Sequence, residues 1–333
     1  MTVSNIGTNY ANNLAIKSLA SQIADLSRQV STGSVAATYA DLGSKAGTSL
    51  NLHAQYNALV NYVGTINGVA LKTDNMDTSL SNITSQIQSV TSAMLKLSQG
   101  GVPNAGTMAQ IQTNAQNALA SIMASLNTSV NGEYVFAGNE TDKPPIADTS
   151  AAGTNVAAIV GTYSSSATPA ATVIANLNAM TEAQLGYDPG LAAAGNNTFQ
   201  AADNVTLNYT LKADTSPFQQ AIKGLAEISS LQYDPNHPTD FWALYNDAQS
   251  RLTTGSTGVT TAQGQLGITR NQMATLSTQQ QSTQLTVSSS ISTFEDADLA
   301  QVSAQLTTLQ TQQQAIYKII SDFSKNSLVQ YLS

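Results

Sequence analysis

The stretch from Ile291 to the C-terminal end carries apolar side chains at alternating intervals of three and four residues. No proline interrupts it, and no glycine follows Gly267. This spacing is typical of a helix with one narrow apolar seam, and about 50 Å of uninterrupted helix fits it at roughly 1.5 Å per residue. A helix with one exposed apolar stripe needs a partner that covers the stripe. The seam positions are Ile291, Phe294, Leu299, Val302, Leu306, Leu309, Ile316, Ile320 and Phe323.

The N-terminal region repeats the same alternation and ends near Gly33, a plausible helix stop. Two seamed helices at opposite ends of one chain suggest a long antiparallel, coiled-coil-like pair. From periodicity alone, an ordinary helical bundle that uses both helices in its core is the alternative. Small and polar residues flank both seams, so one pair buries little apolar surface, which favours assembly of many copies. The candidate assembly interface is Ile16, Leu19, Ile23, Leu26, Val30, Leu299, Val302, Leu306, Leu309, Ile316, Ile320 and Phe323.

The pattern along the chain predicts a mainly α protein with an inserted, outer β-rich module. A second long helix is predicted over roughly 50–98, and Gly100, Gly101 and Pro103 break it. Thr107 is expected to cap the third helix. The predicted seam of the second helix is Leu59, Val63, Ile66, Ala70, Leu80, Ile83, Ile87, Val90, Met94 and Leu97. The predicted regions are an N-terminal assembly helix and turn region (1–49), two halves of a helical rod (50–132 and 216–290), a β-rich variable insert (133–215), and a C-terminal assembly helix (291–333).

The insert is rich in Gly, Ala, Ser and Thr. Short β-branched and aromatic runs predict strands at 133–138, 156–163, 172–174 and 205–211. Sparse apolar content predicts a solvated outer position for this module. Farther along, a helix is expected to begin near Thr239, and the glycines between Gly255 and Gly267 are expected to loosen it before the last long helix.

Composition excludes several classes of function. The net charge is −8 with no cluster of Lys or Arg, which argues against nucleic-acid binding. The absence of cysteine excludes disulfides, thiolate catalysis and Cys-ligated metals. No apolar run reaches membrane-spanning length, so no membrane insertion is expected. The first residues show no cleavable secretion signal, so export would need a route without one.

Residues able to do chemistry are few. His53 and His237 are expected to be solvated or capping histidines, and Asp74 with Asp77 a solvated surface pair. In the acidic group that includes Glu295 and Asp296, Asp298 is expected to pair with Arg28 or Lys17 rather than with a metal. No nucleophile, phosphate-loop or metal motif is present. The sequence therefore predicts a protein with no catalytic, cofactor or metal site, which is not an enzyme.

Three segments resemble one family. The passage NGEYVFAGNETDKPP (131–145) resembles the end of the N-terminal helical region of bacterial flagellins and of hook–filament junction proteins (hook-associated protein 3). Residues 6–9 and 30–33 resemble the opening helix and its stop, and residues 296–300 and 327–332 resemble the C-terminal helix and its end. The resemblance covers roughly 1–145 and 265–333, and the insert at 146–215 has no counterpart.

This resemblance implies a structural subunit of the bacterial flagellum that polymerises through its paired terminal helices into the filament used for motility. It further implies an extracellular location, unfolded passage through the flagellar type III export apparatus, an export chaperone, and hook-associated and cap proteins as further partners. One segment departs from the family. Residues 34–43 lack the Arg-Ile-Asn and paired-Asp sequence of many flagellins, so the resemblance implies nothing about innate-immune receptor recognition.

Two other functions stay open from the sequence. The 133–138 passage and the Tyr331-Leu332 ending also suit the hook–filament junction protein. A surface adhesin or carbohydrate-binding module would need an exposed aromatic platform, for which Trp242 is the candidate. Trp242 lies on a predicted helix beside Phe241, a setting more typical of a core residue.

Overall fold

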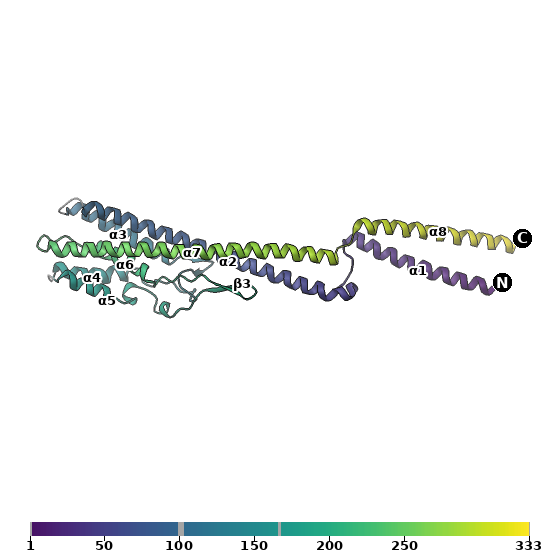
Figure 1. Cartoon of the computed structure of the whole chain (residues 1–333), viewed down its shortest axis with the longest axis horizontal. Coiled ribbons are helices and arrows are strands. Elements are labelled where there is room, and N and C mark those ends of the chain that lie inside the picture. The colour runs from purple at the N-terminus through teal and green to yellow at the C-terminus, as the bar shows by residue number, and fades with distance from the viewer. Residues whose placement is uncertain (1, 99–102, 166–167, 333) are drawn as a thin grey trace. The chain divides into compact units, whose positions relative to one another are not determined.

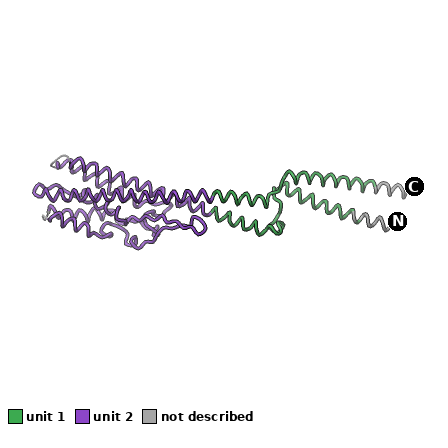
Figure 2. The backbone as a smooth tube through the Cα atoms, in the orientation of Figure 1, with its two compact units in different colours: residues 1–60, 281–333 green, residues 61–280 purple. Residues whose placement is uncertain are grey.

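The computed structural model describes residues 2–98, 103–165 and 168–332, with side chains at 10, 12–98, 103–164 and 168–322. Gly100 and Gly101, the predicted helix breakers, lie outside the described residues. The chain divides into two compact units, shown in Figure 2. Unit 1 contains residues 1–60 and 281–333, and unit 2 contains residues 61–280.

Unit 1 is built on the two terminal helices. Helices α1 (Thr2–Thr32) and α8 (Leu299–Leu332) pack side by side and run in opposite directions (Figure 1). A short 3₁₀ helix, η1 (Tyr39–Lys45), leads into α2 (Ala46–Ser98), whose first residues belong to this unit together with the end of α7 (Pro238–Glu295). The mainly α fold with paired terminal helices is thereby confirmed.

The uninterrupted helix predicted from Ile291 onward is wrong. Helix α7 ends at Glu295 and α8 begins at Leu299. Asp296 forms an antiparallel bridge with Ser34, and Asp298 caps α8 by accepting bonds from the backbone N–H groups of Ala300 and Gln301 at 3.1 Å each. An Asp at this position satisfies N–H groups that a helix start leaves free, so it marks a new helix rather than a continuing one.

The core of unit 2 lies between helices. Helix α2 buries one face at intervals of three and four residues, and α3 (Ala105–Leu126), α6 (Ser216–Ser230) and α7 contribute to the same core. The predicted seam of α2 is confirmed in this part. The cap of α3 is Asn104 rather than Thr107, because the Asn104 side chain accepts the Thr107 backbone N–H at 2.8 Å. The α2 residues buried in this core are Met76, Leu80, Ile83, Ile87, Val90, Met94 and Leu97.

Two small antiparallel sheets complete unit 2. Strands β1 (Ser129–Val130) and β2 (Glu133–Tyr134) form a hairpin whose turn residues, Asn131 and Gly132, have φ of 55° and 83°. Positive φ at both positions suits the Asn-Gly pair. Strands β3 (Thr198–Ala202) and β4 (Val205–Asn208) form the second hairpin. The predicted strand at 205–211 is thus confirmed for its first four residues, whereas only the first two residues of 133–138 are extended in a strand.

The predicted strands at 156–163 and 172–174 are helical instead. They lie in α4 (Ala151–Ser165) and α5 (Ala170–Ala179), which are followed by the short 3₁₀ helices η2 (Ala183–Leu185) and η3 (Leu191–Ala193). Val156, Val160 and Tyr163 are buried at helical spacing, and α4 packs against α6. Burial of one helical face overrides the β preference of Val and Tyr. The insert is therefore not a solvated outer module, because it shares the core of unit 2.

The glycines of α7 do not loosen it, and the helix is continuous over 58 residues. A Cβ atom at Gly258 would lie 2.5 Å from Cγ of Pro217, and one at Gly255 would lie 3.0 Å from the backbone of Ala221. These two glycines allow α6 to approach α7 closely. Gly264 and Gly267 face open space.

Candidate assembly site

The α1–α8 pair contains the residues predicted to form the assembly interface. Leu19 and Val302 are buried, with 8% and 7% of their surface exposed. Val30 and Leu299 stay exposed, at 37% and 49%. Seven further seam residues are half-buried, and the side chain of Phe323 lies outside the described residues. The half-buried residues are Ile16, Ile23, Leu26, Leu306, Leu309, Ile316 and Ile320.

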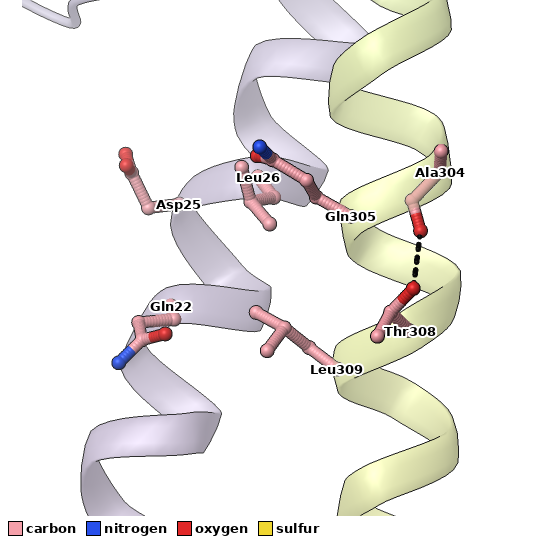
Figure 3. A pocket seen from close by; sticks show the side chains of 7 residues that line it. All are labelled: Gln22, Asp25, Leu26, Ala304, Gln305, Thr308 and Leu309. Carbon is pink, nitrogen blue, oxygen red and sulfur yellow. Dashed lines mark hydrogen bonds between the residues drawn. The ribbon is translucent and has the colours of Figure 1, made fainter.

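A groove of about 440 Å³ opens between the two helices where the seam is incompletely packed. Figure 3 shows Leu26 of α1 and Leu309 of α8 facing the space between the ribbons. Apolar surface that a two-helix pair leaves open to water can bind apolar side chains from a further helix. The other residues lining the groove are Gln22, Asp25, Ala304, Gln305 and Thr308.

Three threonine hydroxyls beside the seam of α8 are satisfied within the helix. Thr308 donates to the carbonyl oxygen of Ala304 at 2.9 Å, as Figure 3 shows, and Thr307 and Thr311 make the same bond one turn back along the helix. Because such a hydroxyl already has an acceptor, it loses less on being covered by a neighbouring helix. The polar composition beside the seam is thus compatible with close packing.

Charged side chains near the pair contact their own segment. Arg28 bonds Asp25 at 2.8 Å and also donates to the carbonyl oxygens of Ser34 and Val35. The predicted pairing of Asp298 with Arg28 or Lys17 is wrong, because Asp298 caps α8 instead.

Backbone hydrogen bonds join the residues that follow α1 to the residues between α7 and α8. Val35 donates to the carbonyl oxygen of Glu295, and Ala297 donates to that of Gly33, each at 2.8 Å. Gly33 has φ of 73°, in the left-handed region that other residues rarely adopt. The end of α1 and the α7–α8 break are therefore held together by two backbone hydrogen bonds.

Glu295 adds a side-chain contact to the start of α2. Its Oε1 accepts the Ser49 hydroxyl and lies 2.9 Å from Nε2 of His53. The Ser49 bond, followed by His53, lowers the pKa of the Glu295 carboxyl. His53 is thus a half-buried partner rather than a solvated histidine, and its ring also meets the edge of Tyr39. The group is no nucleophile–base pair, since both Ser49 and His53 bond the carboxylate.

His237 is half-buried and bonds an acid of its own turn rather than a helix N–H group. Its Nδ1 lies 2.8 Å from Oδ2 of Asp234 in the turn before α7, and this bond is the largest cause that lowers the pKa of Asp234.

Asp74 is exposed and Asp77 is half-buried, so they lie at the surface as predicted, but they share an ion-pair partner. Arg270 of α7 bonds both carboxylates, with Nη1 3.1 Å from Asp77. Antiparallel packing of α2 and α7 sets Arg270 opposite the two acids, a relation that depends on helix register and carries no local sequence signal.

Within the described residues, no group of three or more His, Cys, Asp or Glu could hold a metal ion. Among the helices in that part of the chain, none is both long and apolar enough to cross a membrane. Trp242 is half-buried, packs against the core of unit 2, and lies 5.2 Å and 5.3 Å from the rings of Phe241 and Tyr245. This placement does not support an exposed aromatic platform.

Comparisons with known proteins give the family. The model of the bacterial flagellin N-terminal helical region matches residues 3–141, and that of the flagellin C-terminal helical region matches residues 250–332. Together the two matches cover more than half of the chain, and they include α1 and α8. A search among curated proteins found no match.

One solved structure shows the same fold. A putative flagellar hook-associated protein from Vibrio parahaemolyticus is similar at 15% identity with a TM-score of 0.54, covering 76% of this chain and 99% of that one. Bacillus cereus FlgL is similar at 13% identity with a TM-score of 0.49, covering 73% and 98%. With both terminal helical regions matched, the chain belongs to the bacterial flagellin family and is a structural subunit of the bacterial flagellum.

Proposed function

We propose that the chain is a subunit of the flagellar filament and polymerises through α1 and α8. The observation that carries this proposal is the groove between the two helices, where Leu26 and Leu309 stay partly open to water after the helices have paired. A single α1–α8 helix pair thus leaves part of its apolar seam uncovered. Neighbouring copies that place a helix against the groove would complete it.

The energetics favour many copies over one. Full burial of a Leu or Ile side chain contributes about 1.5 to 3 kcal/mol, and a half-buried one has part of that still to gain. Seven seam residues are in this half-buried state. Each copy would offer one face to the next and receive another, and such heterologous contacts that do not close produce an open helical polymer.

The partners follow from this assembly. Other copies of the chain form the homopolymer, and hook-associated and cap proteins adjoin it at the ends. An export chaperone would cover the seams before assembly, and export to the cell exterior would use the type III route without a cleaved signal. The subunit binds no nucleic acid, does not insert in membranes and is not an enzyme. The net charge of −8 and the bonding of Ser49 and His53 to one carboxylate support these exclusions.

The hook–filament junction is a second candidate position on the same axis. The fold similarity to a putative flagellar hook-associated protein favours this position. The match extends over 99% of the length of that protein. The two candidates share the terminal-helix assembly and differ in how far a polymer of this chain alone extends.

Electron microscopy of the purified full-length chain tests the function. Under polymerising conditions, long filaments are expected for a filament subunit, whereas short polymers or none would favour the junction role. Chains lacking residues 1–32 or 299–333 should stay monomeric with unit 2 still folded, as shown by a cooperative thermal transition. Filament formation by either truncated chain would overturn assembly through α1 and α8.

A further inference from the structure

Glu227 of α6 is a fully buried carboxyl group without an ordinary hydrogen-bond donor. Its exposed fraction is 0%. Among the described residues, neither of its carboxylate oxygens accepts a hydrogen bond from a side chain or a backbone N–H group. A buried carboxylate left in this state carries a large desolvation cost, so either an ion pair or a proton must compensate it.

Arg251 of α7 is the nearest cation, and it is committed to other oxygens. Its Nε lies 3.4 Å from Oε2 of Glu227 but donates its single proton to Asp247 at 2.6 Å. Its Nη1 donates to Gln220 at 3.2 Å, and its Nη2 donates to Asn178 at 2.8 Å. Arg251 thus joins α5, α6 and α7 while making no hydrogen bond to Glu227.

Lys223 is the second cation of this cluster, on α6 one turn before Glu227. Burial, followed by the nearby charge of Arg251, lowers its pKa. The charged groups that act on Glu227 are therefore Asp247 and Arg251 of α7. Lys223 of α6 acts on Arg251, which is also bonded to Gln220 of α6 and Asn178 of α5. Asp247 has one oxygen bonded by Arg251, which leaves acceptor capacity for a further donor.

We propose that Glu227 is a neutral carboxylic acid at neutral pH and donates its proton to Asp247, so that the α6–α7 contact depends on this proton. The proton explains why neither oxygen of Glu227 accepts a hydrogen bond among the described residues: the group is itself the donor. A carboxylic acid facing a carboxylate shares one proton stably in a buried site, whereas two ionised carboxylates repel each other.

Burial, followed by the charge of Asp247, raises the pKa of Glu227 well above its ordinary value, and Arg251 opposes this shift. A carboxyl whose folded pKa lies above its unfolded pKa stabilises the fold fully below the unfolded pKa. This stabilisation is lost as the pH rises through the folded pKa. The contact between α6 and α7 should therefore weaken on the alkaline side.

Infrared spectroscopy of the full-length chain tests the proton directly. At neutral pH the wild type should show the carbonyl stretch of a protonated carboxylic acid, shifted on exchange into heavy water. Glu227→Gln should remove this band. Glu140→Gln, which changes a half-buried acid of the same unit that is paired with Lys143, should keep it. Absence of the band from the wild type, or its persistence in Glu227→Gln, would overturn the proposal.

Thermal unfolding against pH provides the second readout. Above about pH 4.3, the ordinary pKa of a Glu side chain, the melting temperature of unit 2 should fall more steeply with rising pH for the wild type than for Glu227→Gln, because only the wild type has this proton to lose. Equal slopes would overturn the proposal. If Glu227→Gln does not fold, the wild-type infrared band alone decides. Neither measurement requires a polymer, so the result does not depend on the function proposed above.

Discussion

The backbone N–H of Val35 donates to the carbonyl oxygen of Glu295 across 2.8 Å, although 259 intervening residues separate the two in the sequence. This bond, with its counterpart from Ala297 to Gly33, joins the end of α1 to the break between α7 and α8. The register between α1 and α8 is therefore fixed at this junction. The number of helical turns between an α1 residue and the junction determines which α8 residue it can contact.

Replacing Leu306 and Leu309 with Asp should abolish polymerisation. Leu309 lines the groove and Leu306 is half-buried in the seam, so each carboxylate would have to be desolvated when a neighbouring helix covers it. The matched control is Gln310→Asp, which adds a charge on an exposed position of the same helix. Sedimentation and negative-stain microscopy measure polymer yield. A wild-type yield from the double variant would refute the seam as the interface.

Acid should loosen the junction between α1 and α7 through Glu295. The Ser49 hydroxyl, followed by His53, lowers the pKa of Glu295. Its stabilising contribution is therefore present above the unfolded pKa and is lost as the pH falls through the folded pKa. Amide hydrogen exchange at Val35 and Ala297, compared between about pH 6 and about pH 3, should show less protection in acid after correction for the intrinsic rate.

Two variants separate this effect from general acid unfolding. Glu295→Gln should make protection at Val35 less dependent on pH, because the titrating group is gone. Ser49→Ala should move the loss of protection to higher pH, since the largest cause that lowers the pKa of Glu295 is removed. Unchanged pH dependence in both variants would show that Glu295 does not control the junction.

Alanine substitutions at two glycines of α7 should have opposite effects. At Gly258 a Cβ atom would collide with Pro217 of α6, so Gly258→Ala should lower the free energy of unfolding by about 1 to 3 kcal/mol. At Gly264 a Cβ atom meets open space, so Gly264→Ala should raise it by about 0.5 to 1 kcal/mol through helix propensity. Denaturant unfolding measures both. Stabilisation by Gly258→Ala would contradict the close α6–α7 packing.

An Asp at Val160 tests whether the insert belongs to the core of unit 2. Val160 is buried in α4, so Val160→Asp should cost about 3 kcal/mol or more and lower the melting temperature. Ala158→Asp, two residues away on the exposed face, should change the stability by less than about 1 kcal/mol. Equal, small changes in stability in both variants would indicate that the insert is a loosely attached outer module.

Sequence periodicity is sufficient to predict a helix and its apolar seam where that helix contacts others along one face. The seams of α1, α8 and α2 were read from intervals of three and four residues, and the structure pairs α1 with α8. The family resemblance at both ends of the chain can also be recognised from the sequence, since it depends on local sequence. The predicted strand at 156–163 is wrong, because short β-branched runs fit a strand or a buried helical face equally well. Only packing against α6 selects the helix.

The sequence alone determined the helical seams, the absence of cysteine chemistry and the family, because each is a property of residues close together in the chain. Tertiary structure decided that Arg270 bonds Asp74 and Asp77, that Glu295 meets Ser49 and His53, and that Glu227 is buried beside Asp247. These pairings depend on the register of helices that are far apart in the sequence. A shift of one residue between two helices would rotate each partner by about 100° away from the other, so no local pattern specifies them.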